Sequence, residues 1–370
     1  MINKILNDPY RLLFPLGLIY LLIGVSIWFP IAFFHSEYYP VILHHFLLID
    51  GFMLSFIGGF LMTAVPKFSK SYPTKPLELI IFAILPFLGL KDALNESNNI
   101  LLISMLQSLF LLQFMLMRIF KRKENPPYTF IFIPMALLMI AVVSLLGFFD
   151  SPYYSIEALF LCPISLIILG IGSRLIPGIL GHVEIVKQQR EIYEKPLPLF
   201  STIPKNILIL SLLFISTFFY QHWISNLIQF QIVAYFAFKY WNLGIAPKTK
   251  TALTWSIWIT CWFFVSGYLL KLLWPSGAIH GLHWIFIAVF ANLAILISTR
   301  VTVSHAGQES SLENSKILFW ITFFSIFAMS TRILAYILTD LYESHLGYGA
   351  FLMIVMAFLW IFKYARYFFV

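Results

Sequence analysis

Twelve long apolar segments, joined by short loops that alternate between basic and non-basic, constrain this chain more than any other feature of its sequence. A bilayer core about 30 Å thick requires about 20 apolar residues per helix. Backbone polar groups within hydrocarbon must be hydrogen-bonded inside the segment, which a helix achieves. The sequence therefore predicts an all-α, polytopic integral membrane bundle of about 12 transmembrane helices. The expected spans are 12–34, 43–65, 77–95, 99–120, 128–149, 155–180, 204–220, 223–240, 251–273, 279–300, 316–339 and 344–366.

The basic residues predict the orientation of these spans. When the loops are assigned in turn to two sides, almost every lysine and arginine falls on one side. Only Lys91 and Lys271 fall on the other, and Arg332 lies inside a span. An excess of lysine and arginine marks the cytoplasmic loops of membrane proteins. Both termini are then expected in the cytoplasm.

The composition excludes several classes of protein. A chain that is 60% hydrophobic and 11% charged is not an ordinary soluble domain, because a water-facing surface requires roughly a quarter charged residues. The net charge of +8 lies in short loops, so membrane insertion and anionic lipid explain it better than nucleic acid, which is not an expected partner. Cys162 and Cys261 lie in apolar spans without CxxC or CxxCH spacing, which excludes a disulfide framework, a thiolate zinc site and covalent c-type haem. Any haem is expected to be non-covalent and b-type.

Residues 1–370 are expected to form a single transmembrane domain. Spans two, six and ten end in related strings, which are TAVPK at Thr63, SRLIP at Ser173 and TRVTV at Thr299. Two interpretations remain open at this point. The strings indicate three repeats of four helices, or they recur by chance in a sequence of such biased composition.

Two pairs of histidines lie at the expected outer ends of two spans. His280 and His283 are three residues apart, which places both imidazoles on one helix face. His44 and His45 are adjacent and point about 100° apart on a helix, so only one of them is expected to face a shared site. Neutral imidazole is a good ligand for haem iron, copper or zinc. The alternative is that these histidines anchor helix ends among the lipid headgroups.

Charged residues inside spans suggest further site residues. Asp50 and Arg332 are expected at similar depth, either as an ion pair between two helices or with Arg332 facing an anionic group such as a haem propionate. Arg174 and Arg300 end their spans at the expected inner side, where each is either a site residue or a residue whose side chain reaches the headgroups. His283 and Arg300 are about 25 Å apart along one helix, so they cannot share a small site.

Three stretches carry a resemblance to a known family. The first, LHHFLLIDGFMLSFIGGFLMTAVPKF at 43–68, matches the pattern WHAHEMxFGF followed by IAGFLLTAVPNW. The second is GSRLIP from Gly172, similar to GGRVIP. The third runs from His283 through Arg300 to SHAG at 304–307, where the pattern has a histidine, a later arginine and SLGHTG. These stretches are similar to the NnrS family of bacterial membrane proteins, which is associated with the response to nitric oxide and described as carrying haem and copper.

The resemblance implies site residues only at the matched positions. It implies haem or metal ligation by His44, His283 and His305, with Arg174 and Arg300 at a cofactor site. The second histidine and the glutamate of the HAHE string correspond to Phe46 and Leu47 here. Copper at that string is therefore expected only if the extra histidines, His45 and His280, compensate.

The resulting expectation is a haem-binding protein of the bacterial inner membrane that binds or detoxifies nitric oxide during the nitric oxide stress response and in connection with denitrification. Its expected partners are the lipid bilayer, nitric oxide or a similar small ligand, and an unidentified electron partner. The alternatives are a membrane nitric oxide oxidoreductase, an electron-transfer cytochrome and, less favoured, a secondary transporter. Transporters place polar residues or broken helices at mid-membrane, whereas these spans are rich in Leu, Ile and Phe there. The sequence leaves enzymatic turnover open.

Overall fold

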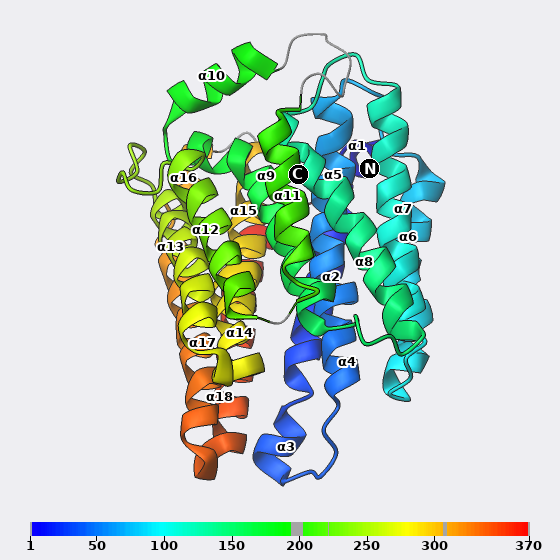
Figure 1. The fold of residues 1–370 in the computed structure, drawn as a ribbon, viewed down its shortest axis with the longest axis vertical. Coiled ribbons are helices and arrows are strands. Elements are labelled where there is room, and N and C mark those ends of the chain that lie inside the picture. Colours follow the sequence, from blue (N-terminus) through cyan, green and yellow to red (C-terminus); the bar gives the residue numbers. More distant parts are fainter. Residues whose placement is uncertain (1, 194–202, 221, 306–308, 369–370) are drawn as a thin grey trace. The chain divides into compact units, whose positions relative to one another are not determined.

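The computed structural model describes residues 2–193, 203–220, 222–305 and 309–368, and all regular secondary structure in these ranges is helical (Figure 1). The predicted all-α fold is therefore confirmed. The chain divides into two compact units. The first unit comprises residues 1–13 and 57–248, and the second unit comprises residues 14–56 and 249–370. Residues 194–202, and Ala306 and Gly307 of the third motif, lie outside the described residues.

Nine helices in the described ranges are long and apolar enough to cross a membrane. Each coincides with an expected span, which supports a multi-pass membrane protein. They are Tyr10–Phe34, Val41–Phe68, Ile100–Phe120, Tyr128–Phe148, Glu157–Ile179, Ala252–Leu273, Ile279–His305, Ser311–Ile337 and Thr339–Phe368.

The other three expected spans are also helices, but they are not among these nine, so the count of about 12 is not confirmed. α11 (Lys205–Ser216) has 12 residues and is therefore about 18 Å long, well short of a bilayer core. α12 (Trp223–Lys239) has 17 residues. α6 (Pro76–Leu94) has 19 residues, but its ends carry charged side chains, including Glu78 and Lys91.

Local sequence explains where several helices begin. α6 begins at Pro76, where the missing backbone N–H lies among groups that have no partner within the helix in any case. The backbone N–H of Lys75 donates to the Glu78 carboxylate over 2.8 Å, so the first turn is capped. α13 (Ala252–Leu273) begins after Thr251, whose hydroxyl oxygen accepts from the backbone N–H of Thr254.

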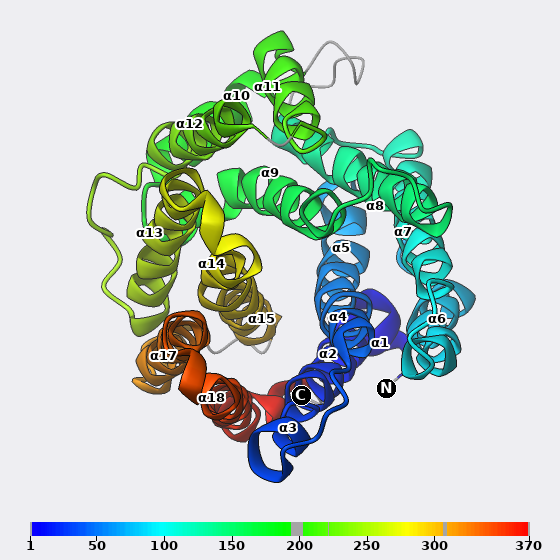
Figure 2. The same cartoon turned by 60° about the horizontal axis from the view of Figure 1, so that its bottom comes forward.

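The first unit is built around consecutive helices that pack on their neighbours in the chain. α7 packs against α6 and α8, and α8 packs against α9, as Figure 2 also shows. Besides α6, α11 and α12, the elements of the first unit are α1 (Ile2–Asn7), most of α5 (Leu54–Phe68), α7 (Ile100–Phe120), η2 (Tyr128–Ile131), α8 (Phe132–Phe148), η3 (Glu157–Leu161), α9 (Cys162–Ile179) and α10 (Val183–Tyr193).

The second unit holds the N-terminal histidine segment together with the C-terminal third of the chain. α17 packs along α18, and α14 packs against both α13 and α17 (Figure 2). Its elements are most of α2 (Tyr10–Ser26), α3 (Phe29–Phe34), α4 (Val41–Phe46), η1 (Leu47–Met53), η5 (Pro275–Gly277), α14 (Ala278–Ile285), η6 (Phe286–Ala291), α15 (Asn292–His305), α16 (Glu309–Glu313), α17 (Ile317–Ile337), η7 (Thr339–Leu341), α18 (Tyr342–Tyr364) and η8 (Ala365–Phe368).

Three long helices contain a π-helical segment that hydropathy did not predict. These segments are η1, η3 and η6, and each lies toward the beginning of its helix. Short π segments within α-helices are rare and occur frequently at functional sites. The helices concerned are the three that end in the related strings, while the division into three repeats stays a prediction.

Candidate functional site

The second unit brings four polar residues from three separate chain segments into one cluster, which we call the histidine cluster. It consists of His44 on α4, His280 and His283 on α14, and Arg332 on α17. His283 interacts electrostatically with Arg332, His44 and His280, and His44 interacts with Arg332 as well. The structure thus brings together His44 and His283, which lie far apart in the sequence. His45 adjoins the cluster, with its ring centroid 6.0 Å from that of His44.

His283 is held in an orientation suited to ligation. Its Nδ1 atom lies 2.7 Å from the carbonyl oxygen of Ile279, one turn earlier on α14. A carbonyl oxygen only accepts hydrogen bonds, so Nδ1 carries the proton and donates it, which leaves a lone pair on Nε2. Within the described ranges Nε2 has no hydrogen-bond partner. An imidazole anchored through Nδ1 is the usual arrangement of a histidine that binds a metal through Nε2.

His44 has the same anchor and one competitor. Its Nδ1 atom lies 2.9 Å from the carbonyl oxygen of Gly24 and also 2.9 Å from Nε1 of Trp28. The carbonyl only accepts and the indole N–H only donates, so the two hydrogen bonds require different tautomers of His44. The tautomer that donates to Gly24 leaves a lone pair on Nε2, whereas the tautomer that accepts from Trp28 carries its proton there. Trp28 therefore competes with ligation by His44.

His280 is placed to hold Arg332 and not to bind a metal. Nη1 of Arg332 donates to Nδ1 of His280 over 2.8 Å. Because Nδ1 accepts, the proton of a neutral His280 lies on Nε2, and neither nitrogen is then available as a ligand. The His280 ring also packs 4.7 Å from the ring of Tyr336. The sequence left open whether Arg332 pairs with Asp50 or faces an anionic ligand, and the structure shows its guanidinium hydrogen-bonded to His280.

The surroundings of Arg332 leave its positive charge available to an anionic group of a ligand. The guanidinium lies 5.8 Å from the ring centroid of Tyr342, which provides a cation–π contact. No carboxylate in the described ranges forms an ion pair with it. Asp50 is buried within η1. A half-buried guanidinium of this kind is suited to an anionic group of a ligand.

The two ligand candidates occupy equivalent positions relative to the π segments. η1 begins three residues after His44, and η6 begins three residues after His283. The hydroxyl of Ser325 donates to the carbonyl oxygen of Ile287 in η6 over 2.9 Å, so this altered backbone is hydrogen-bonded from α17. Both histidines therefore precede a local change in helical register.

Two other expected site residues of the second unit, His305 and Arg300, are not brought to the cluster. His305 ends α15, 22 residues after His283 and so about 33 Å along the same long helix, and its Nδ1 donates to the carbonyl oxygen of Val301 over 2.7 Å. Arg300 lies near that end and pairs with Glu313. Arg174 belongs to the first unit, where it donates to the carbonyl oxygen of Val186 over 3.2 Å.

The residues fit a haem better than a metal ion held by protein side chains alone. In the parts of the chain that the structure describes, no three His, Cys, Asp or Glu side chains are grouped to hold a metal ion. Copper and zinc sites generally need three or four such ligands. A haem brings four nitrogen ligands of its own and needs only one or two axial imidazoles.

A comparison with known protein families now places the chain. The family model described as NnrS protein matches residues 4–369, which is nearly the whole chain. The chain belongs to the NnrS family. This membership supports a role in the nitric oxide response in general. Comparisons with curated proteins and with solved structures give no match.

Several contacts in this member of the NnrS family had no signal in its sequence. Trp28 lies 16 residues before His44 and contacts it only because the turn between α2 and α3 lies beside α4. The π segments likewise have no marker in the hydropathy pattern. Tyr336 was detectable in principle, because it follows Arg332 by four residues on α17 and so lies on the same helix face.

Proposed function

We propose that this protein binds a b-type haem at the histidine cluster and acts in the nitric oxide response by binding or detoxifying nitric oxide in the bacterial inner membrane. The observation that carries the proposal is the shared geometry of His44 and His283. Each has a backbone carbonyl oxygen within hydrogen-bonding distance of Nδ1, and the two imidazoles interact electrostatically within one unit. His283, and His44 in one of its tautomers, therefore present an Nε2 lone pair.

The charge of the cluster supports the same ligand. A b-type haem carries two propionates, and a buried anion needs a compensating cation. Arg332 supplies that cation from α17 and is held by His280 over 2.8 Å. His44 and His283 both interact electrostatically with this guanidinium. Ligation by imidazole and neutralisation by arginine are thus available in one place.

Aromatic side chains support a dry site around the two imidazoles. The Trp28 ring centroid lies 4.9 Å from that of His44, and the Phe286 ring centroid lies 6.1 Å from that of His283. Such rings exclude water and present apolar surface, which suits both the flat face of a porphyrin and an apolar gas. Nitric oxide dissolves in lipid, so a site within a helical bundle needs no polar channel to receive it.

When bound, haem iron supplies either a binding position for nitric oxide or a redox centre for one electron. If His283 alone held the haem iron, the iron would remain able to bind a small molecule, and this would favour binding or turnover of nitric oxide. Ligation by both His44 and His283 favours an electron-transfer cytochrome, which is our second candidate because both imidazoles have a carbonyl anchor. The chain's own residues hold the ligand, neutralise its charge and exclude water in either case.

The test is an optical spectrum of the full-length protein, purified from haem-replete cells. We expect a Soret band that is lost in His283→Ala and reduced in His44→Ala. His305→Ala is the matched control, because its Nδ1 has a similar carbonyl anchor at the distant end of the same helix, and it should retain the band. A preparation without a Soret band, or equal loss in all three variants, would contradict the proposal.

A second measurement separates the two candidate functions. Nitric oxide is added to the reduced protein while the Soret band is recorded. An immediate shift of the band indicates an open or readily displaced axial position. A band that does not respond, together with reversible one-electron reduction, favours the electron-transfer cytochrome.

A further inference from the structure

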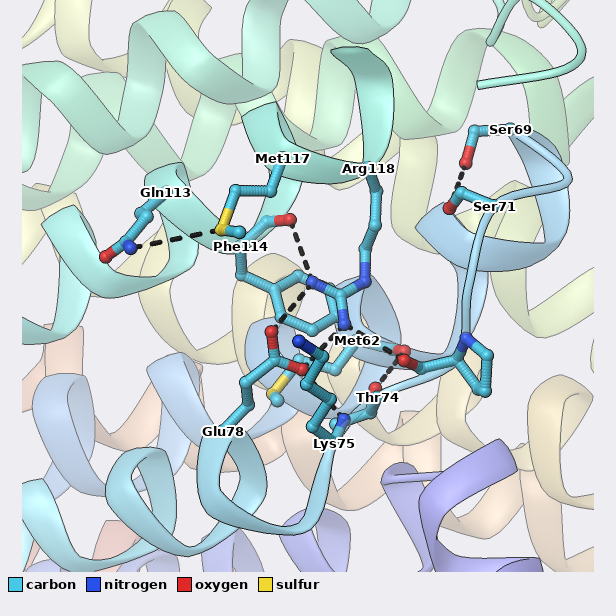
Figure 3. A network of polar contacts seen from close by, with 11 residues as sticks. Met62, Ser69, Ser71, Thr74, Lys75, Glu78, Gln113, Phe114, Met117 and Arg118 are labelled. Atoms are coloured by element: carbon cyan, nitrogen blue, oxygen red, sulfur yellow. Dashed lines mark hydrogen bonds and ion pairs between the residues drawn. The ribbon is translucent and has the colours of Figure 1, made fainter. Parts of the chain in front are cut away.

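The first unit contains a charged cluster that plays no part in the proposed haem site. It lies where the beginning of α6 and the end of α7 meet the loop at residues 69–75, and Figure 3 shows its hydrogen bonds. Arg118, in the last turn of α7, is fully buried. Its guanidinium donates to both oxygens of Glu78, at 3.1 and 2.6 Å, and to the carbonyl oxygens of Phe114 and Pro73. The charge of Arg118 is thereby neutralised, and the loop is fixed in place.

Arg118 and two lysines, Lys75 and Lys121, approach the aromatic ring of Tyr72. The Arg118 guanidinium lies 4.4 Å from the ring centroid of Tyr72, and the Nζ atoms of Lys75 and Lys121 lie 5.5 and 5.6 Å from it. Both lysines are exposed. The carboxylate of Glu78, which faces this cluster, is already engaged by Arg118 and by a backbone N–H. Lys75 and Lys121 therefore remain two adjacent positive charges that lack a carboxylate partner in the described part of the chain.

Neighbouring lysines behave differently. Lys67 pairs with Asp8 over 2.7 Å, and Lys70 pairs with Glu124. Lys67 and Lys70 are thus compensated by carboxylates, whereas Lys75 and Lys121 beside Tyr72 have no such partner in the described ranges. The hydroxyl of Tyr72 adds a second deficit, because it is buried without a hydrogen-bond partner in the described ranges. An anion that carries acceptor oxygens would compensate the charge of Lys75 and Lys121.

The helices that lead away from this charge expose apolar side chains. On α6 they recur every three or four residues, which marks one helix face. α7 continues this surface from the neighbouring position. A positive site at the end of an apolar helical surface matches an anionic phospholipid, with phosphate at the amines and acyl chains along the helices. The exposed residues are Leu77, Ile80, Ile81, Ile84, Phe87 and Leu88 on α6, and Leu106, Leu109, Met117 and Phe120 on α7.

We infer that Lys75 and Lys121 form a binding site for the headgroup of an anionic phospholipid. Both lysines approach the Tyr72 ring, which also contacts the buried Arg118. The site lies entirely in the first unit and does not depend on the haem proposal. Lysine is suited to this role because its ammonium donates to phosphate from several directions. Tyr72 and Arg118 are positioning residues here, since they fix the two amines without requiring contact with the lipid.

Native mass spectrometry of the full-length protein tests the inference. The protein is titrated with phosphatidylglycerol or with phosphatidylcholine of the same acyl chains. We expect preferential retention of phosphatidylglycerol, and we expect the double variant Lys75→Gln/Lys121→Gln to reduce this preference about tenfold. The control Lys123→Gln/Lys187→Gln removes two exposed charges from the same unit that make no cation–π contact with the Tyr72 ring in the described ranges, and should keep the preference.

Two outcomes would overturn the inference. An equal loss of preference in both double variants would mean that overall charge attracts the lipid and that no local site exists. Protection of the protein against thermal unfolding by inorganic phosphate as effectively as by phosphatidylglycerol would indicate a site for a free anion. Because glutamine is polar and uncharged and both lysines are exposed, the variants are expected to fold, and unchanged melting temperatures check this.

Discussion

Arg332 donates a hydrogen bond of 2.8 Å to Nδ1 of His280. This contact divides the histidines of the cluster into two roles. The Nδ1 atoms of His44 and His283 lie against carbonyl oxygens, whereas Nδ1 of His280 faces a guanidinium. Only the first arrangement leaves a neutral imidazole with a lone pair on Nε2. His280 therefore belongs with Arg332 and not with the ligands.

Replacement of His280 by alanine should leave the haem in place but weaken its binding. The ligands are unchanged, whereas Arg332 loses the partner that orients it. A charge-assisted hydrogen bond contributes about 1.5–3 kcal/mol, so we expect haem affinity to fall about tenfold in His280→Ala and similarly in Arg332→Gln. Titration of the apoprotein with haem, followed at the Soret band, measures this. Complete loss of the band in His280→Ala would mean that His280 is itself a ligand.

Replacement of Trp28 by phenylalanine should leave haem binding intact or strengthen it. Trp28 stabilises the tautomer of His44 that carries a proton on Nε2, and phenylalanine removes this donor while it keeps an aromatic ring. A hydrogen bond contributes about 1 kcal/mol, so the gain is at most about fivefold in affinity. The same haem titration measures it. A clear decrease in affinity would show that the indole supports the bound state.

Two glycine substitutions in the histidine-bearing helices should have opposite effects. A Cβ atom on Gly51, within η1, would overlap the ring of Tyr20, so Gly51→Ala should lower the free energy of unfolding by about 1–3 kcal/mol. A Cβ atom on Gly281 of α14 would have its nearest neighbour 3.9 Å away on Trp274, and alanine favours a helix there by about 1 kcal/mol. Melting temperatures in detergent compare the two. Equal destabilisation would contradict the packing described for η1.

The ion pair between Arg300 and Glu313 should stabilise the protein without affecting the haem. The Arg300 side chain is 35% exposed and Glu313 12%, so solvent screens the pair and Arg300→Gln should cost about 1 kcal/mol. Lys316→Gln removes an exposed charge from the same region and serves as the control. We expect a lower melting temperature only in the first variant, with the Soret band unchanged in both. A lost Soret band in Arg300→Gln would restore Arg300 to the cofactor site.

The sequence predicts the helices well because hydropathy is a local property. The expected span 99–120 is found as Ile100–Phe120, and 251–273 as Ala252–Leu273. It predicts the candidate ligands His44 and His283 through motif spacing. It does not predict the partner of Arg332, because depth in the membrane limits which residues can meet but does not choose among them. The choice of His280 over Asp50 follows from how α14 and α17 pack.

Because of the π-helical turns at η1 and η6, the direction in which each histidine points can change while the rest of its helix stays the same. A π-helical turn accommodates one residue more than an α-helical turn. Loss of a single residue there would return the backbone to regular α-helix and swing His44 or His283 about 100° around the axis. The apolar stretch below would keep its register. A one-residue insertion or deletion could thus redirect an imidazole without refitting the membrane-buried part, which is a route by which sites of this kind can diverge.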